Sequence, residues 1–175
     1  RVRARDLELN ESWFRDAIFD NPEIVIAPCR EAGRVIEEDW FAWKIEEDFG
    51  AGPVDVVLIS SKGRIGLVET KLSYNPQKRR EVVAQVLDYA LALQDMDFED
   101  LPALPAASVA TREDIEDAKI AGRFLLVIAG DALDPRALRL SQALLARQLT
   151  NEWDLAMIDL NLFKQQDGLG LVLVP

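Results

Sequence analysis

Apolar residues recur at two spacings along the chain, and each spacing predicts one kind of element. Apolar positions three and four residues apart over residues 7–19 predict a helix, which ends at Asn21-Pro22 because the residue before proline avoids the helical conformation. The strongest helical pattern covers residues 77–94, with Pro76 just before it. Two further helices are predicted, over residues 111–119 behind a Thr111 cap and from Asp134-Pro135 to Leu149.

Runs of valine, isoleucine and leucine predict strands. Residues 54–60 and 64–72 are two such runs, joined by the short connection Ser61-Lys62-Gly63, and they predict a β-hairpin. Residues 124–130 form an apolar run that is typical of a strand buried on both faces. Four further strands are predicted, over residues 23–28, 40–46, 153–163 and 169–174. The order of elements predicts a single domain over residues 1–175, of class α/β (α+β), with a mixed central β-sheet flanked by helices.

Composition excludes several kinds of chemistry. The 175 residues include no histidine, which removes Ser-His-Asp triads, Cys-His dyads and histidine-based metal sites. Cys29 is the single cysteine, so the chain has neither an intrachain disulfide nor a multi-cysteine zinc site. Carboxylates, lysine and hydroxyl groups remain, and carboxylates prefer hard cations such as Mg²⁺ and Mn²⁺.

The ends and the hydropathy of the chain bear on its location. No apolar run approaches the roughly 20 residues that span a bilayer, and no signal peptide is recognisable at the start. We therefore expect a cytoplasmic protein with no membrane partner. Because the chain begins with Arg1 and not with methionine, we also expect a fragment of a longer protein.

The charge pattern is uneven. A net charge of −11 argues against nucleic-acid binding, because phosphate contacts supply most non-specific affinity. Residues 62–80, however, carry six basic side chains against one acid, and acidic stretches lie on both sides. This block favours a local anion-binding surface, and an ordinary mixed surface stays open as the alternative.

The predicted hairpin brings charged residues together. With a three-residue turn, Ser60 pairs with Arg64, Asp55 falls opposite Glu69, and Lys71 shares the face of Glu69. Two carboxylates about 5 Å apart repel unless something positive sits between them, and a divalent cation fits that gap. The alternative is a solvated ion cluster on an open sheet face. The apolar flanks of both acids favour a site.

The residues around the hairpin resemble a known family. Gly52-Pro53-Val54-Asp55 and Val68-Glu69-Thr70-Lys71 resemble the motif of the PD-(D/E)XK nuclease superfamily. Gln85-x-x-x-Tyr89 resembles the helix motif of its RecB-like branch. Glu11 with Asn21-Pro22-Glu23 resembles the start of the nuclease domain of archaeal mismatch endonucleases and their bacterial relatives. The resemblance spans about residues 7–95.

The resemblance implies a restriction-endonuclease-like core and a Mg²⁺- or Mn²⁺-dependent deoxyribonuclease. It makes Asp55, Glu69 and Lys71 the catalytic residues, with Asp55 and Glu69 as metal ligands and Lys71 orienting the attacking water. It further implies that Thr70 lends its backbone carbonyl to the metal and that Glu11 is a third acid. Phosphodiester hydrolysis needs these parts, because a metal activates water and a cation balances the developing charge.

The helix after the hairpin carries a predicted DNA-binding edge. Lys78, Gln85 and Tyr89 lie seven and four residues apart and hence on one stripe, next to Arg79 and Arg80. A phosphate contact, an amide and a stacking ring suit a nucleic-acid strand. A half-buried helix face with a satisfied amide is the alternative for Gln85 and Tyr89.

Two functions stay open from the sequence. The first is a metal-dependent nuclease acting on DNA of unspecified strandedness. The second is a catalytically silent domain of the same fold that serves as a protein-interaction or assembly module, which the net acidic charge favours. A homodimer, or further domains of a longer chain, also stay open as partners.

Overall fold

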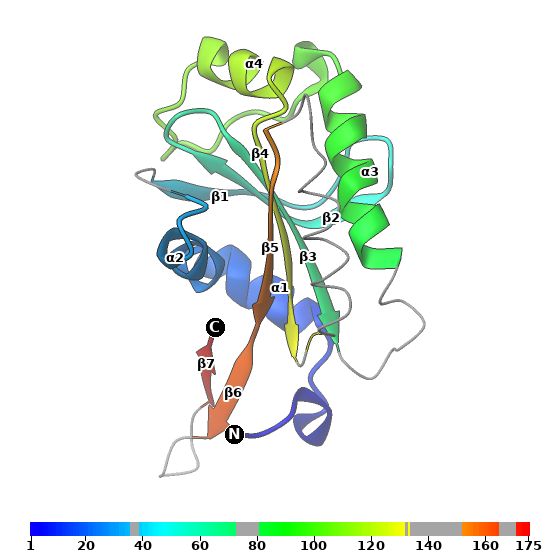
Figure 1. The fold of residues 1–175 in the computed structure, drawn as a ribbon, viewed down its shortest axis with the longest axis vertical. Helices are drawn as coiled ribbons and strands as arrows, with labels where there is room; N and C mark the ends of the chain where they lie inside the picture. Colours follow the sequence, from blue (N-terminus) through cyan, green and yellow to red (C-terminus); the bar gives the residue numbers. More distant parts are fainter. Residues whose placement is uncertain (36–38, 73–80, 132, 134–151, 165–170) are drawn as a thin grey trace.

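The described residues form a five-stranded mixed β-sheet at the centre of the molecule (Figure 1). The computed structural model describes residues 1–35, 39–72, 81–131, 133, 152–164 and 171–175. The strand order is β1-β2-β3-β4-β5, antiparallel from β1 to β3 and parallel from β3 to β5. The strands are β1 (Trp40–Asp48), β2 (Pro53–Ser60), β3 (Ile65–Leu72), β4 (Phe124–Asp131) and β5 (Asp154–Asp159).

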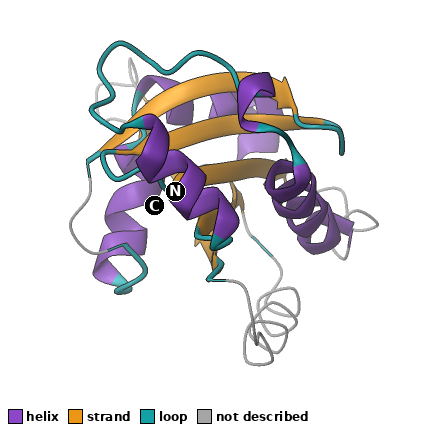
Figure 2. Ribbon diagram, turned by 90° about the horizontal axis from the view of Figure 1, so that it is seen from above, coloured by secondary structure: helices purple, strands orange, loops and turns teal. Residues whose placement is uncertain are grey.

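Helices cover both faces of this sheet (Figure 2). The α-helices are α1 (Glu11–Asp20), α2 (Glu23–Glu31), α3 (Glu81–Asp95) and α4 (Arg112–Ile120). Side chains of a strand alternate between faces, so Val56 and Leu58 join the core under α1 and α2, while Val57 and Ile59 join the core under α3 and α4. The predicted mixed sheet flanked by helices is confirmed.

Shorter elements complete the described fold. Val2 forms an isolated bridge with Leu162, which brings the N-terminal segment beside β6 (Figure 1). β6 and β7 pair antiparallel as a separate two-stranded sheet. The shorter elements are the 3-10 helices η1 (Ala4–Leu7) and η3 (Phe98–Asp100) and the strands β6 (Asn161–Lys164) and β7 (Leu171–Val174). No helix in the described part of the chain is long and apolar enough to cross a membrane.

The β2–β3 hairpin has the predicted register. The pairs run from Ile59 with Ile65 to Val56 with Val68, so the position numbers of each pair add up to 124. Gly63 occupies the turn with a φ of +76°, a conformation that glycine adopts without a steric cost. A three-residue turn thus places the start of β2 beside the end of β3.

Two predictions near the N-terminus are wrong. Residues 23–28 belong to α2 and not to a strand, because Val25, Ile26 and Cys29 all face the core at helical spacing. A short apolar run alone does not separate a buried strand from a buried helix. The first helix begins at Glu11 and not at residue 7, because the Asn10 side chain accepts a hydrogen bond from the Trp13 N–H and caps α1 there.

The remaining predictions have mixed outcomes. The capping box of α4 is present, with Thr111 and Asp114 bonded to each other. Every residue of β4 is buried, as its apolar run predicts. The strand predicted over residues 153–163 is divided into β5 and β6. The helix predicted from Asp134 and the first residues of the helix predicted over 77–94 lie outside the described residues.

Candidate active site

Glu69 is a buried carboxylate in the middle of the sheet. It lies two residues beyond Leu67 in β3, and the alternation of the strand directs its side chain to the face that α3 covers. Only 3% of Glu69 is exposed. Burial, followed by the nearby charge of Asp55, raises the pKa of Glu69 to about 7. A buried acid lowers the free energy of unfolding when it is ionised. Strongly shifted pKa values of this kind are concentrated at functional sites.

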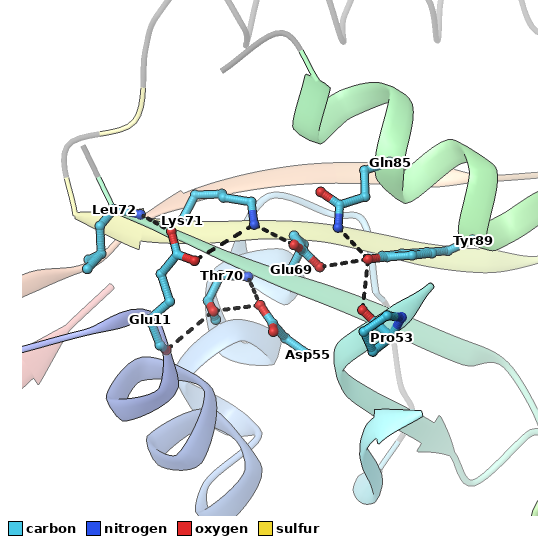
Figure 3. A network of polar contacts seen from close by, with 9 residues as sticks. All are labelled: Glu11, Pro53, Asp55, Glu69, Thr70, Lys71, Leu72, Gln85 and Tyr89. Atoms are coloured by element: carbon cyan, nitrogen blue, oxygen red, sulfur yellow. Dashed lines mark hydrogen bonds and ion pairs between the residues drawn. The ribbon is translucent and has the colours of Figure 1, made fainter. Parts of the chain in front are cut away.

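Lys71 forms an ion pair with Glu69. Its Nζ donates a hydrogen bond to Glu69 Oε1 at 2.5 Å and lies 4.0 Å from Glu11 Oε2 (Figure 3). Burial lowers the pKa of Lys71, but the hydrogen bond to Glu69 and the charges of Glu69, Glu11 and Asp55 outweigh it and raise that pKa. Lys71 is therefore held as an ammonium ion among carboxylates.

Asp55 is bound to the backbone and side chain of Thr70. Its Oδ2 accepts a hydrogen bond from the Thr70 N–H at 2.7 Å and another from the Thr70 hydroxyl at 2.6 Å. Its Oδ1 makes no hydrogen bond to any residue that the structure describes. The hairpin ladder ends at the pair of Val56 and Val68, one position before Asp55 and Glu69. The predicted pair of Asp55 and Glu69 is therefore not part of the ladder, and Asp55 contacts β3 through Thr70.

Glu11 ties the start of α1 to the end of β3. Its Oε1 accepts a hydrogen bond from the Leu72 N–H at 3.3 Å, and its backbone carbonyl accepts one from the Thr70 hydroxyl at 3.4 Å. With Lys71 near its second carboxylate oxygen, Glu11 lies at the edge of the site. The N-terminal helix therefore supplies an acid next to the hairpin (Figure 3).

Tyr89 is buried beneath the site, and its predicted role as a stacking ring is wrong. The residue is 1% exposed and belongs to the core under α3, so its ring is closed to a nucleic-acid base. Its hydroxyl donates to the Pro53 carbonyl at 2.8 Å. Glu69 Oε2 lies 3.4 Å from the Tyr89 hydroxyl oxygen. Burial and the charge of Glu69 raise the pKa of Tyr89 to about 12, which keeps the phenol protonated.

Gln85 lies one turn before Tyr89 on α3 and bonds to it. The Gln85 side-chain amide donates to the Tyr89 hydroxyl. The spacing of four residues that suggested a shared DNA-binding stripe is also the spacing at which two side chains of a helix bond to each other. This pair positions Tyr89 against Glu69, so the alternative of a satisfied amide on a buried helix face describes it better.

The predicted basic surface is only partly visible. Lys78, Arg79 and Arg80 lie outside the described residues. Arg64 belongs to the same block but forms an ion pair with Asp154 at 2.5 Å, and its side chain is only 15% exposed. Together with Lys62 it lies at the turn of the hairpin, at the opposite end of β2 from Asp55. These two cations are therefore remote from the acids.

Gly130 is a residue of the site that the sequence reasoning missed. It pairs with Lys71 in the parallel ladder between β3 and β4. A Cβ at Gly130 would lie 1.7 Å from the Lys71 carbonyl oxygen, so only glycine fits there. The available signal was a glycine inside a strand pattern, which often marks a close backbone approach.

Asp55 and Glu69 offer hard oxygen atoms that could hold a divalent cation. Among the described residues, no group of three or more acidic, cysteine or histidine side chains gathers closely enough to hold a metal ion. Mg²⁺ commonly binds through one or two carboxylates and keeps several waters. Asp55 has one carboxylate oxygen that is unbonded within the described part of the chain. Asp55 and Glu69 fit the Mg²⁺ pattern because both are hard oxygen donors.

Comparison with known proteins gives two similar folds. No protein-family model matches the chain, and no curated protein matches it. A repair endonuclease from Pyrococcus abyssi is similar in structure, with a TM-score of 0.47 and 18% identity over 86% of this chain and 47% of that one. EndoMS in a complex with dsDNA has a TM-score of 0.47 and 20% identity over 85% of this chain and 44% of that one. The chain spans less than half the length of either protein, and at this identity the likeness concerns the fold alone.

Proposed function

We propose that this chain is a Mg²⁺-dependent nuclease of the PD-(D/E)XK type that hydrolyses phosphodiester bonds in DNA. The observation that carries the proposal is the ion pair between the buried Glu69 and the partly buried Lys71, beside Asp55. Burying a carboxylate and an ammonium group costs free energy that a pair of apolar side chains would not cost. The fold nevertheless buries Glu69 and pairs it with Lys71, and the motif resemblance makes both residues catalytic.

Asp55 and Glu69 are the residues that would hold the metal. Bound there, Mg²⁺ or Mn²⁺ would supply polarisation of a phosphoryl oxygen and a lower pKa for a bound water that could serve as the nucleophile. The carboxylates hold their positions through neighbouring bonds, Asp55 through Thr70 and Glu69 through Lys71 and Tyr89. Such fixed partners reduce the reorganisation that accompanies the reaction.

Lys71 supplies the positive charge next to the reacting phosphate. Its ammonium group is oriented by Glu69 and has three N–H donors, so it can donate to a water or to a phosphate oxygen while it keeps the ion pair. A cation in a partly desolvated position stabilises the charge that develops on the phosphate more strongly than it would in water. DNA as the polymer rests on the resemblance of Val68-Glu69-Thr70-Lys71 to the PD-(D/E)XK superfamily and of Gln85-x-x-x-Tyr89 to its RecB-like branch.

The test is a DNA cleavage assay with matched lysine variants. We expect the purified protein with Mg²⁺ or Mn²⁺ to cleave single- or double-stranded DNA, and Lys71→Ala to reduce the rate by about 100-fold or more. Lys119→Ala is the control, because Lys119 donates to the Gln94 carbonyl away from the acids and should leave the rate unchanged. Thermal melts verify that each variant is folded.

Two results would contradict the proposal. Equal cleavage by the wild-type protein and Lys71→Ala would indicate a contaminating nuclease. No cleavage of either form of DNA by the wild-type protein with either metal would favour the catalytically silent domain that recognises another protein.

A further inference from the structure

The structure assigns Thr70 a positioning role through its side chain: we propose that the Thr70 hydroxyl orients Asp55 so that Oδ1 faces the metal. This inference rests on the proposed function. The motif resemblance gives Thr70 only a backbone role, whereas the structure shows the hydroxyl in contact with Asp55 and with the start of α1 (Figure 3). A change at the hydroxyl should therefore alter metal affinity without touching a metal ligand.

The two bonds from Thr70 converge on one oxygen of Asp55. The N–H lies 2.7 Å and the hydroxyl 2.6 Å from Oδ2, both short distances that are typical of bonds to an ionised carboxylate. Two donors from different directions limit rotation of the carboxylate more than one donor does. Because Thr70 is only 1% exposed, little water competes for these bonds.

The Thr70 hydroxyl supplies a second hydrogen bond to Asp55 that the Thr70 backbone alone does not. The N–H of Thr70 would remain in any variant, but Oδ2 would then have a single donor and the carboxylate could turn. The hydroxyl has one proton, and the 2.6 Å contact with Asp55 is much closer than the 3.4 Å contact with the Glu11 carbonyl. Asp55 is therefore the main acceptor, and the Glu11 contact is secondary.

The chain contains a matched pair that serves as a control. Thr111 donates to Asp114 Oδ2 from its N–H at 2.8 Å and from its hydroxyl at 2.6 Å, which repeats the contacts of Thr70 with Asp55. This pair caps α4 and is exposed to solvent. Loss of the Thr111 hydroxyl should lower stability through the helix cap and leave the metal site intact.

The experiment measures Mn²⁺ affinity directly, without a DNA substrate. Thr70→Ser and Thr70→Ala both lose the methyl group and differ only in the hydroxyl, and Thr70→Val keeps the β-branched shape. Electron paramagnetic resonance of free Mn²⁺ gives the dissociation constant for each variant. We expect Thr70→Ala and Thr70→Val to weaken binding by about 10-fold or more, as loss of a group that orients a metal ligand typically does.

Thr70→Ser should bind Mn²⁺ within about threefold of the wild-type protein, because the hydroxyl is retained. Thr111→Val should melt at a lower temperature without metal and keep the wild-type affinity for Mn²⁺. If Thr70→Val does not fold, the Ser and Ala variants still isolate the hydroxyl.

Three outcomes would overturn the inference, and they separate it from the proposed function. Wild-type affinity in Thr70→Ala would show that the hydroxyl does not orient Asp55, while the metal site itself stands. Equal loss in Thr70→Ser and Thr70→Ala would assign the effect to packing of the methyl group. No Mn²⁺ binding by the wild-type protein would remove both this inference and the metal-dependent nuclease.

Discussion

The Lys71 carbonyl oxygen occupies the position that a Cβ atom on Gly130 would need, so glycine is required there. The two residues are partners in the parallel ladder of β3 and β4, and a Cβ on Gly130 would be 1.7 Å from that oxygen. Because Gly130 has no side chain, the backbone segment that carries Lys71 can lie close against β4. The position of the candidate catalytic lysine depends on a residue of the neighbouring strand.

The first prediction is that Gly130→Ala lowers the free energy of unfolding by about 3 kcal/mol or more, because β3 and β4 must separate to admit the methyl group. Gly50→Ala is the control. Gly50 has a φ of +103° but no atom within 4 Å of an added Cβ, so that variant has backbone strain without a clash. Urea denaturation of both variants measures the difference. Equal losses would show that β4 does not approach Lys71 closely enough to exclude a methyl group.

The second prediction concerns the pH dependence of stability without metal. The pKa of Glu69 is about 7 in the folded protein against 4.5 for the ordinary side chain. Between these values the folded state binds more protons than the unfolded state, so stability falls as pH rises. The contribution of Glu69 is fully present below pH 4.5 and is lost as pH rises through about 7. Its size is on the order of 3 kcal/mol at most.

Glu69→Gln isolates this contribution, since the amide does not titrate. We expect the free energy of unfolding, measured by urea denaturation in EDTA from pH 5 to pH 8, to fall more steeply with pH for the wild-type protein than for Glu69→Gln. Parallel curves for the two proteins would mean that Glu69 has the same pKa folded and unfolded, which would contradict its burial.

Some of the site could be predicted because local rules decide it. The three-residue turn with glycine determines the register of the hairpin, and the register places Asp55 near the end of β3. The strand alternation likewise predicts that Glu69 and Lys71 share a face. Both inferences need only residues that are close in the chain or paired by one turn.

Other parts depend on contacts that no local rule specifies. The bonds from Thr70 to Asp55 depend on how one carboxylate turns, and strand spacing does not specify that rotation. The burial of Tyr89 depends on how α3 packs against β3, so an exposed stacking ring and a buried hydroxyl were both compatible with the same spacing. Residues 23–28 belong to a helix whose buried face consists of Val25, Ile26 and Cys29. Cys29 lies one residue beyond the predicted strand, so the run alone did not show the helical spacing.

The third prediction follows from the burial of Tyr89. Tyr89→Phe removes the hydroxyl and leaves the Pro53 carbonyl and the Gln85 amide without that partner. We expect a loss of about 1–3 kcal/mol in the free energy of unfolding. Gln85→Ala should cost less, because the Tyr89 hydroxyl keeps its bond to Pro53. Urea denaturation checks both variants, and a larger loss in Gln85→Ala than in Tyr89→Phe would contradict the role of Tyr89 as the centre of this network.

The last prediction concerns the basic block as the origin of DNA affinity. Lys78, Arg79 and Arg80 follow the hairpin in a chain of net charge −11, so any phosphate-binding side chains should concentrate there. Replacing all three by alanine should weaken DNA binding and reduce the slope of log Kd against log salt by about 0.9 for each phosphate that the variant no longer neutralises. The matched control replaces Arg3, Arg123 and Lys164, which are exposed, lie outside residues 62–80 and carry the same total charge. Fluorescence anisotropy between roughly 50 and 200 mM salt, a range over which phosphate binding weakens steeply, compares the two triple variants. Equal effects would mean that overall charge, and not this block, determines binding.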